Sequence, residues 1–376
     1  MNILILAPDY PNVYRASFEF VKNLVDALAD RGNHCYVIAP YSVTREKRFW
    51  RGTEFVKMDN GGSVTVVRPN TFTFSNWKIG RFNFTELSTK VSIKIALNSM
   101  KFKPDVAYGH FWSCGKELYM YAKERRIPLY VATGESVIPN PVFSNKELIS
   151  FRDYVKGVVC VSSKNRDESI ELGLTTSDKC LLVPNGIDNR MFRVLDKQEC
   201  RKQLGLPQDC FIVAFLGWFK HVKGPRRLAA ALDSIRDGET VYSIFIGAGL
   251  KEDPICNNIL FKGRLKHHEI PPYLNSADVF VLPTLHEGCC NAIIEAMACG
   301  LPIISSNLPF NWDVLNNRNS IMIDPNNISD IANAIKRLRD DKTLRMQLRQ
   351  GAIETAKDLT IDKRAAKIEE FIKSTM

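Results

Sequence analysis

Two glutamates, Glu287 and Glu295, stand eight positions apart where a loop is predicted to enter a helix. The surrounding segment, residues 277–307, has the pattern strand, loop, helix and strand, and Gly300 and Pro302 are typical of the end of that helix. Ionised carboxylates accept hydrogen bonds from neighbouring hydroxyl groups, so the pair suits binding of a polyol such as a sugar. A surface helix with two solvated glutamates is the alternative interpretation.

The first turn of the same predicted helix is a candidate anion site. The backbone amides at about Cys290, Asn291 and Ala292 have no partner within the helix and can donate to a phosphate. Other phosphate fingerprints are absent: there is no G-x-x-x-x-G-K-[ST], and no G-x-G-x-x-G follows the first strand. Gly247 and Gly249 form only a G-x-G, which is typical of a tight turn after a strand. A nicotinamide oxidoreductase therefore lacks its usual sequence support.

The elements that position these residues follow one pattern, in which short apolar runs alternate with amphipathic segments. Strands are expected at 2–7, 34–39, 64–68, 105–108, 129–132, 157–161 and 181–184, and then at 211–216, 241–246, 258–261, 279–282, 303–305 and 321–323. Helices are expected at 18–28, 83–100, 226–235, 328–339, 341–358 and 361–375. Strands separated by helices predict parallel sheets that are covered on both faces.

The predicted fold class is α/β, with two Rossmann-like doubly wound domains facing a central cleft. A polar, turn-rich connection at 185–209 separates two such units. We place the first domain at 1–188 and the second at 189–360, and expect the last helix, about 361–376, to pack back onto the first domain. Ligands of such folds bind at the carboxyl ends of the strands, so the cleft is the expected site.

Composition narrows the function classes. The chain has 376 residues, 45% of them hydrophobic and 24% charged, which excludes a disordered chain. Its net charge of +10 suits anionic partners. A nucleic-acid partner is not predicted, because the chain has no compact basic recognition helix or zinc finger; a polyanion-binding protein without catalysis is a distant alternative. Ten cysteines without a C-x-x-C pair, and the absence of a signal or membrane-spanning segment, predict a cytoplasmic protein with no bound metal.

Four segments carry a resemblance to a known family. Residues 287–302, EGCCNAIIEAMACGLP, closely resemble the E-x7-E signature of glycosyltransferase family 4. Residues 183–188, VPNGID, are similar to the interdomain turn of that family, and residues 217–224, GWFKHVKG, to its G-R-x5-K-G loop. Residues 31–39 resemble its junction between the first helix and the second strand. The resemblance covers nearly the whole chain and is strongest from 183 to 325.

The resemblance implies a GT-B fold and a retaining transferase that moves a sugar from a nucleotide-diphosphate sugar without a metal or other cofactor. The first domain would bind the acceptor and the second the donor. Glu295 would hold the donor ribose, Glu287 the transferred sugar and Lys223 the diphosphate, while His110 would approach the reacting sugar. The implied catalytic residues are Glu287, Lys223 and His110. The implied donor-binding residues are Gly217, Trp218, Lys220, Arg264, Cys290, Asn291, Ala292 and Glu295.

Two positions depart from the family pattern. Trp218 stands where the family has an arginine, so one diphosphate cation is missing. Lys220 and Arg264 are the candidate replacements, and a solvated strand-end charge is the alternative for Arg264. The glycine pair that often follows the first strand is also absent, and Arg15 in that loop is either a further phosphate cation or an ordinary exposed arginine.

Substrates are predicted only by class. With Asn291, the loop resembles that of transferases that use uridine donors. A UDP-hexose or UDP-N-acetylhexosamine is therefore the first expected donor, and a GDP-sugar the second. A saccharide or lipid-linked saccharide of the cell surface is the expected acceptor. A sugar-nucleotide epimerase or a phosphorylase on the same fold is the alternative activity.

Residues 45–103 hold twelve Lys or Arg against four acids, with nine aromatic residues among them. We expect this stretch to meet the anionic inner face of the plasma membrane, unless the aromatic residues form core.

Overall fold

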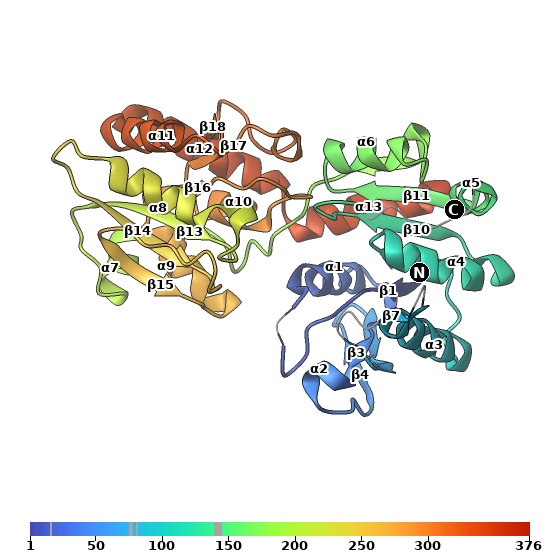
Figure 1. The fold of residues 1–376 in the computed structure, drawn as a ribbon. Helices are drawn as coiled ribbons and strands as arrows, with labels where there is room; N and C mark the ends of the chain where they lie inside the picture. Colours follow the sequence, from blue (N-terminus) through green and yellow to red (C-terminus); the bar gives the residue numbers. More distant parts are fainter. Residues whose placement is uncertain (16, 75–77, 80–81, 139–144) are drawn as a thin grey trace. The chain divides into compact units, whose positions relative to one another are not determined.

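The computed structural model describes residues 1–15, 17–74, 78–79, 82–138 and 145–376. The chain divides into two compact units: Met1–Val183 together with Asp362–Met376, and Pro184–Ile361. Each unit is built around its own mainly parallel sheet with helices packed against it (Figure 1). The predicted α/β class with two Rossmann-like domains is confirmed.

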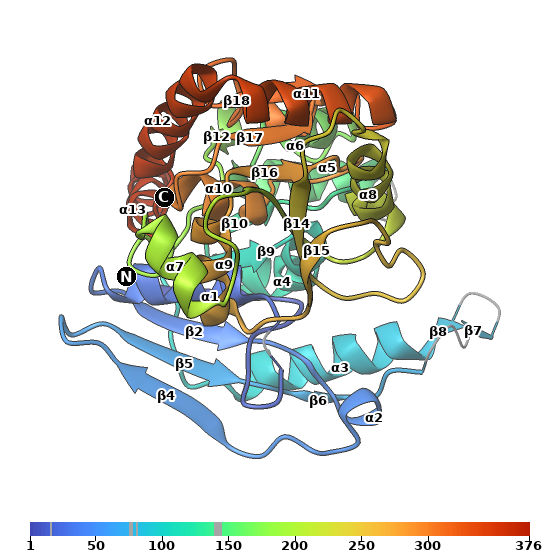
Figure 2. The same ribbon diagram turned by 90° about the vertical axis from the view of Figure 1, so that its left-hand side faces the viewer.

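The first unit contains an eight-stranded sheet in the order β12-β11-β10-β9-β1-β2-β5-β4. Its neighbouring strands are parallel, except that β4 runs antiparallel to β5 at the edge, as Figure 2 shows. The strands are β1 (Asn2–Leu6), β2 (His34–Ile38), β4 (Thr53–Lys57), β5 (Ser63–Val67), β9 (Val106–His110), β10 (Leu129–Thr133), β11 (Val155–Cys160) and β12 (Cys180–Leu182). Short pairs join β3 (Tyr41–Ser42) to β6 (Asn70–Thr71) and β7 (Lys78–Ile79) to β8 (Phe82–Asn83).

Helices cover both faces of this sheet. They are α1 (Glu19–Ala29), α2 (Val43–Glu46), α3 (Phe84–Ser99), α4 (Trp112–Arg125), α5 (Asn145–Tyr154), α6 (Ser163–Glu171) and α13 (Ile361–Thr375). Alternate residues of β1 point to opposite faces, and Leu4 and Leu6 join one buried cluster with Ile93 of α3 and Leu118 of α4. Helix α13 packs on β10 and β11, where Tyr130 donates to the Ile372 carbonyl at 3.2 Å.

The boundaries of the two units differ from the predicted ones by a few residues. The chain leaves the first unit after Val183 and re-enters it at Asp362, rather than after 188 and 360. The reason is a backbone pairing within the second unit: the Ile187 amide donates to the Leu359 carbonyl at 2.9 Å, and the Ile361 amide donates back to Ile187. Buried Ile187 also joins the core of the second unit, so the 184–188 turn belongs there.

The second unit contains a six-stranded, fully parallel sheet in the order β15-β14-β13-β16-β17-β18. The strands are β13 (Phe211–Leu216), β14 (Val241–Ile246), β15 (Ile259–Gly263), β16 (Val279–Leu282), β17 (Ile303–Ser306) and β18 (Ser320–Ile323). The helices are α7 (Lys197–Gln203), α8 (Pro225–Ser234), α9 (Ile270–Ser276), α10 (Asn291–Ala298), α11 (Ile328–Asp340) and α12 (Lys342–Asp358). The strand order reverses direction at β13, where α/β folds open a crevice at the carboxyl edge of the sheet.

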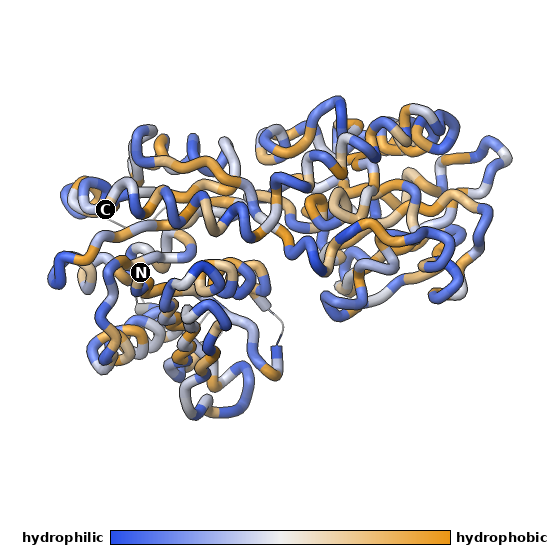
Figure 3. The backbone as a smooth tube through the Cα atoms, turned by 180° about the vertical axis from the view of Figure 1, so that it is seen from behind, coloured by the Kyte–Doolittle hydropathy of each residue, from blue (hydrophilic) through white to orange (hydrophobic). Residues whose placement is uncertain are grey.

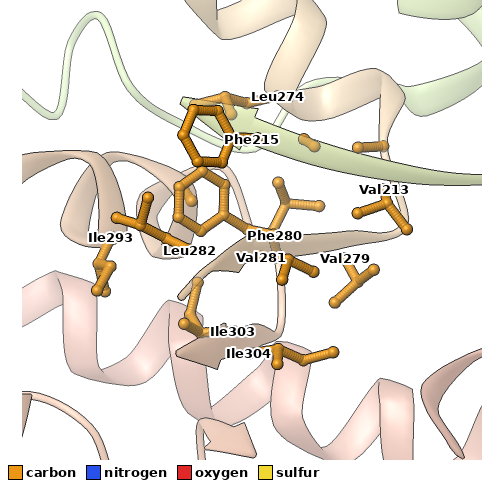
Figure 4. Packing of buried hydrophobic residues seen from close by; sticks show 14 of the residues in the cluster. Val213, Phe215, Leu274, Val279, Phe280, Val281, Leu282, Ile293, Ile303 and Ile304 are labelled. Carbon is orange, nitrogen blue, oxygen red and sulfur yellow. The ribbon is translucent and has the colours of Figure 1, made fainter. Parts of the chain in front are cut away.

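The core of the second unit is a continuous apolar layer (Figure 4). Val279, Phe280, Val281 and Leu282 of β16 are all fully buried, as a strand with helices on both faces requires. Figure 3 shows apolar stretches running through the interior of each unit, hydrophilic stretches on many outer loops, and helices in which apolar and hydrophilic residues alternate. This rigid layer fixes the loops after β13 and β16, which carry most of the candidate site.

Candidate active site

Lys223 and Glu287 form an ion pair at the carboxyl edge of the second sheet. Lys223 ends a 3-10 helix (His221–Lys223) that follows β13, and Glu287 lies in the loop between β16 and α10. The Lys223 side chain is 22% exposed and that of Glu287 12%. The Thr284 hydroxyl donates to the same carboxylate at 3.2 Å. The structure therefore joins two residues that the family resemblance assigns to different parts of the donor.

Close contacts between two loops bring this pair together. The Leu285 amide donates to the Val222 carbonyl at 2.8 Å, and the Thr284 hydroxyl oxygen lies 3.2 Å from the same carbonyl oxygen. Gly224 has a φ of 73° and lies so close to the second loop that a Cβ would approach the Pro283 carbonyl oxygen to 2.6 Å. Glycine at position 224 thus allows both the turn and the contact that places Lys223 beside Glu287.

Lys223 keeps its positive charge in this partly buried setting. Burial by itself lowers the pKa of a lysine, but the pKa of Lys223 is raised, because the charge of Glu287 and the hydrogen bond to it favour the protonated form. A lysine that stays protonated near neutral pH supplies a fixed cation where negative charge develops.

Helix α10 begins in the loop that carries Glu287. Cys290 is its N-cap residue, and the Cys290 side chain makes no capping hydrogen bond to the first turn, which starts with Asn291 and Ala292. The amino end of α10 can therefore meet an anion. Cys290 is buried, and burial raises the pKa of its thiol, so its backbone rather than its sulfur is available for binding. The Asn185 side chain fixes this loop, donating to the Asn291 side-chain oxygen at 2.8 Å and to the Cys289 carbonyl at 3.4 Å.

Glu295 lies one turn into α10 and is paired with a histidine. Its carboxylate is 3.0 Å from Nε2 of His267, which lies after β15 and packs against the ring of Phe192. Glu295 is only 9% exposed, so the histidine fixes the orientation of a nearly buried carboxylate. The sequence gives no local signal for His267, which is 28 residues before Glu295. Asn185 was also missed as a site residue, although the VPNGID turn that contains it was a usable signal.

The remaining predicted donor residues gather around a cavity of about 190 Å³ at the carboxyl ends of β13, β14 and β15. Gly217, Trp218 and Arg264 line it. The Arg264 guanidinium carbon lies 5.8 Å from the centre of the Trp218 ring, and the Lys220 ammonium lies 5.9 Å from it. Both candidate replacements for the missing arginine thus lie beside Trp218.

His110 belongs to the first unit and ends β9. It is 5% exposed and lies among aromatic rings, with Phe111 at 4.8 Å and Phe20 at 5.6 Å between ring centres. Within the described part of the chain, its buried Nδ1 has no hydrogen-bond partner. Burial, and to a smaller extent the positive charge of Arg364, lower the pKa of His110 to about 3. The imidazole is therefore neutral at physiological pH and can accept or donate one hydrogen bond.

Glu135 holds the chain that follows His110. Phe111 has a φ of 81°, a left-handed conformation that costs energy in a residue with a side chain. The Glu135 carboxylate accepts hydrogen bonds from the Trp112 amide at 2.8 Å, the Thr133 hydroxyl at 2.8 Å and the Gly134 amide at 2.9 Å. It thereby caps the start of α4, where the N-cap residue Phe111 makes no side-chain capping hydrogen bond.

Acid should destabilise the protein through His110. In the unfolded chain, His110 binds a proton near the ordinary histidine pKa of 6.5, whereas in the folded protein it stays neutral to about pH 3. The contribution of the neutral histidine to stability is therefore present above pH 6.5 and is lost as the pH falls towards 3. We expect the wild-type free energy of unfolding to fall by about 2 kcal/mol more than that of His110→Gln between pH 7 and pH 5. Urea unfolding at several pH values measures the difference, and equal slopes for the two proteins would contradict the neutral histidine.

Three further findings concern other candidate features. Arg15 pairs with Asp9 at 3.2 Å and Glu46 at 3.8 Å, so its charge is balanced within its own unit. Among the described residues, no group of three or more His, Cys, Asp or Glu is arranged to hold a metal ion. In the same part of the chain, no helix has both the length and the apolar character needed to cross a bilayer.

Two family models match the chain in succession. Residues 19–190 match Glycosyltransferase Family 4, and residues 196–355 match Glycosyl transferases group 1. A Bacillus subtilis glycosyltransferase named for teichuronic acid biosynthesis is 28% identical over 261 residues, which cover 67% of this chain and 66% of the relative. An Escherichia coli UDP-Gal:alpha-D-GlcNAc-diphosphoundecaprenol alpha-1,3-galactosyltransferase is 28% identical over 230 residues, or 57% of this chain and 59% of the relative. The chain thus spans 66% of the length of the first relative and 59% of the length of the second, less than two thirds of each.

A solved structure agrees over the full length. Anabaena Alr3699/HepE, determined in complex with UDP and glucose, is 18% identical to this chain, with a TM-score of 0.72. The match covers 100% of both chains. Its likeness confirms the predicted GT-B fold class.

Proposed function

The chain belongs to glycosyltransferase family 4, and on that premise we propose that it transfers a hexose or N-acetylhexosamine from a nucleotide-diphosphate sugar, with a UDP-sugar favoured. The acceptor is a saccharide or a lipid-linked saccharide, and the anomeric configuration is retained. The names of two similar proteins support the choice of donor, since one uses UDP-Gal and the other was crystallised with UDP and glucose.

The observation that carries this proposal is the Lys223–Glu287 pair in the loops beside the start of α10. A departing diphosphate gains negative charge, and a fixed ammonium together with helix amides stabilises that charge. Glu287 would accept hydrogen bonds from hydroxyls of the transferred sugar, and Glu295 from the ribose.

The proposed reaction needs no protein nucleophile. The bond from the anomeric carbon to the diphosphate oxygen breaks while the acceptor oxygen approaches the same face of the sugar. The departing phosphate oxygen takes the proton of the acceptor hydroxyl, so the products are the glycoside and the nucleoside diphosphate. Positioning of donor and acceptor supplies most of the rate.

A thermal-shift series tests the donor class. UDP-glucose, UDP-galactose, UDP-N-acetylglucosamine, GDP-mannose and ADP-glucose are compared at equal concentration, because a ligand that binds the folded state more tightly raises the Tm further. We expect one or more UDP-sugars to give the largest shift. No shift with any nucleotide sugar would contradict the proposal, and so would formation of an epimer from the stabilising donor in the absence of an acceptor.

Activity is expected to survive removal of divalent cations, because Lys223 and the start of α10 supply the positive charge that a metal would otherwise bring. Nucleoside diphosphate release from the stabilising donor is measured in the presence of acceptor, with and without EDTA. Less than a two-fold change is expected. Loss of activity in EDTA that magnesium or manganese restores would mean that a metal holds the diphosphate.

The proposal includes a cytoplasmic location, with docking on an anionic membrane surface. Phe49 and Phe72 form an exposed edge-to-face pair, with 57% and 38% of each residue accessible to solvent. Four exposed cations lie close to Phe49 in the sequence: Arg45, Lys47, Arg48 and Arg51. Aromatic rings settle at the membrane interface, and each cation near an anionic leaflet contributes about 1 kcal/mol.

Co-sedimentation with vesicles tests the docking. We expect binding to phosphatidylserine-containing vesicles at low salt, loss of binding at 0.5 M NaCl, and at least ten-fold weaker binding when all four cations are replaced by glutamine. Lys342→Gln on α12 is a single-charge control in the other unit. Equal recovery in the supernatant with anionic and neutral vesicles would contradict the docking.

A further inference from the structure

Trp218 is an exposed aromatic residue in an otherwise ordered loop. It is 55% exposed, although its neighbour Phe219 is only 4% exposed and packs in the core against Phe215. The indole lines the 190 Å³ cavity together with apolar groups of Ala248 and Leu265. A large aromatic face that borders a cavity, rather than filling one, is suited to contact a ligand.

Backbone contacts fix the loop that carries this residue. The Phe219 amide donates to the Ala248 carbonyl at 2.9 Å, and the Gly217 amide donates to the Ile246 carbonyl at 2.9 Å. The two glycines of the G-x-G turn make this packing possible: a Cβ on Gly247 would come within 1.9 Å of the Gly217 carbonyl oxygen, and one on Gly249 within 2.3 Å of the Phe219 oxygen. Trp218 is therefore held on a preorganised strand-end loop, which lowers the entropic cost of binding.

Two cations lie beside the indole ring. Arg264 is 5.8 Å and Lys220 is 5.9 Å from its centre, and both side chains are exposed. A flat heteroaromatic ring can stack on an indole or on a guanidinium plane, and the two cations can meet an anionic group attached to that ring. The chemistry of the cavity therefore matches a nucleobase attached to an anionic group better than either part alone.

We propose that Trp218 is the stacking platform for the base of the nucleotide donor, and that Arg264 and Lys220 hold the base and the adjoining phosphate against it. This inference rests on the proposed function, because it assigns one part of the same donor. It also accounts for tryptophan at this position: the residue contributes affinity through the base, while Lys223 and the start of α10 act on the diphosphate.

Isothermal titration calorimetry of the full chain with UDP, uridine and inorganic pyrophosphate tests the platform. Base stacking on an aromatic side chain is worth about 1–3 kcal/mol per base, so Trp218→Ala should weaken UDP binding by about 5- to 150-fold. Pyrophosphate binding should stay within two-fold of wild type, and Trp218→Phe should keep UDP binding within about five-fold. Met346→Ala, which removes another exposed large side chain in the same unit, is the control for surface effects.

These measurements distinguish a failure of the stacking role of Trp218 from a failure of the proposed function on which it rests. Unchanged UDP affinity in Trp218→Ala, or an equal loss for UDP and pyrophosphate, would overturn the stacking role while leaving the donor class intact. A wild-type protein that binds none of UDP, GDP and ADP would overturn the proposed function itself, and the platform with it. Quenching of tryptophan fluorescence by uridine that disappears in Trp218→Phe would support the platform directly.

Discussion

Replacing Lys223 with alanine is expected to lower turnover by about 100-fold or more. The ammonium pairs with Glu287 and lies in the same loop cluster as the start of α10, so in the proposed reaction it is one of few groups that offset the charge of the departing diphosphate. Such a contact is strongest in the transition state, and the loss should fall mainly on kcat. Steady-state kinetics with the donor found by thermal shift measures it.

A double variant separates catalysis from simple charge balance. Removing Lys223 also leaves Glu287, a carboxylate that is 12% exposed, without its cation, and this by itself destabilises the loop. If Lys223 acts on the diphosphate, Lys223→Ala with Glu287→Gln should regain stability, but its turnover should stay well below that of Glu287→Gln alone. Equal turnover in the double variant and in Glu287→Gln would mean that the lysine only neutralises the glutamate. Lys336→Ala removes a lysine that pairs with Asp237 on the surface, and it should leave kcat unchanged.

The sequence was most informative where local chemistry determines structure. The predicted helix at 83–100 corresponds to α3, because Asn83 accepts hydrogen bonds from the amides of Thr85 and Glu86 and thus caps it. The parallel strands of both sheets were located because buried parallel strands form short apolar runs. The loop-to-helix junction around Glu287 and Glu295 was likewise placed correctly, since α10 spans Asn291–Ala298.

Features that depend on long-range contacts were not predictable. The edge strand β4 was missed, because Phe55 and Val56 are exposed and give it no buried alternating pattern. Arg68 was counted with the membrane-facing cations, but it is 4% exposed and donates to the Tyr10 carbonyl at 2.9 Å and to Glu54 at 3.1 Å. A charge that the tertiary structure buries and pairs looks like a surface charge in a one-dimensional sequence.

The pairing of Glu295 with His267 is the clearest case of a site contact that only the structure reveals, and it sharpens the expected effect of mutating Glu295. The histidine keeps the carboxylate oriented, so the ribose would meet a preorganised acceptor. We expect Glu295→Ala to weaken UDP binding by about 10- to 150-fold, because a hydrogen bond to a charged group contributes about 1.5–3 kcal/mol. His267→Asn should produce a smaller loss, since it removes only the orienting contact.

Binding of 2′-deoxy-UDP tests which ribose hydroxyl Glu295 contacts. If Glu295 accepts a hydrogen bond from the 2′-hydroxyl, wild-type protein should bind UDP more tightly than 2′-deoxy-UDP, and Glu295→Ala should bind the two with nearly equal affinity. Calorimetric titration of both ligands against both proteins forms a double-mutant cycle that isolates this one contact. If the carboxylate binds the 3′-hydroxyl instead, Glu295→Ala should keep the wild-type preference for UDP over 2′-deoxy-UDP. The variant should then bind UDP and 3′-deoxy-UDP with nearly equal affinity. Equal affinity of all these ligands for the wild-type protein would mean that Glu295 does not hold the ribose, and that its bond with His267 serves only to stabilise α10.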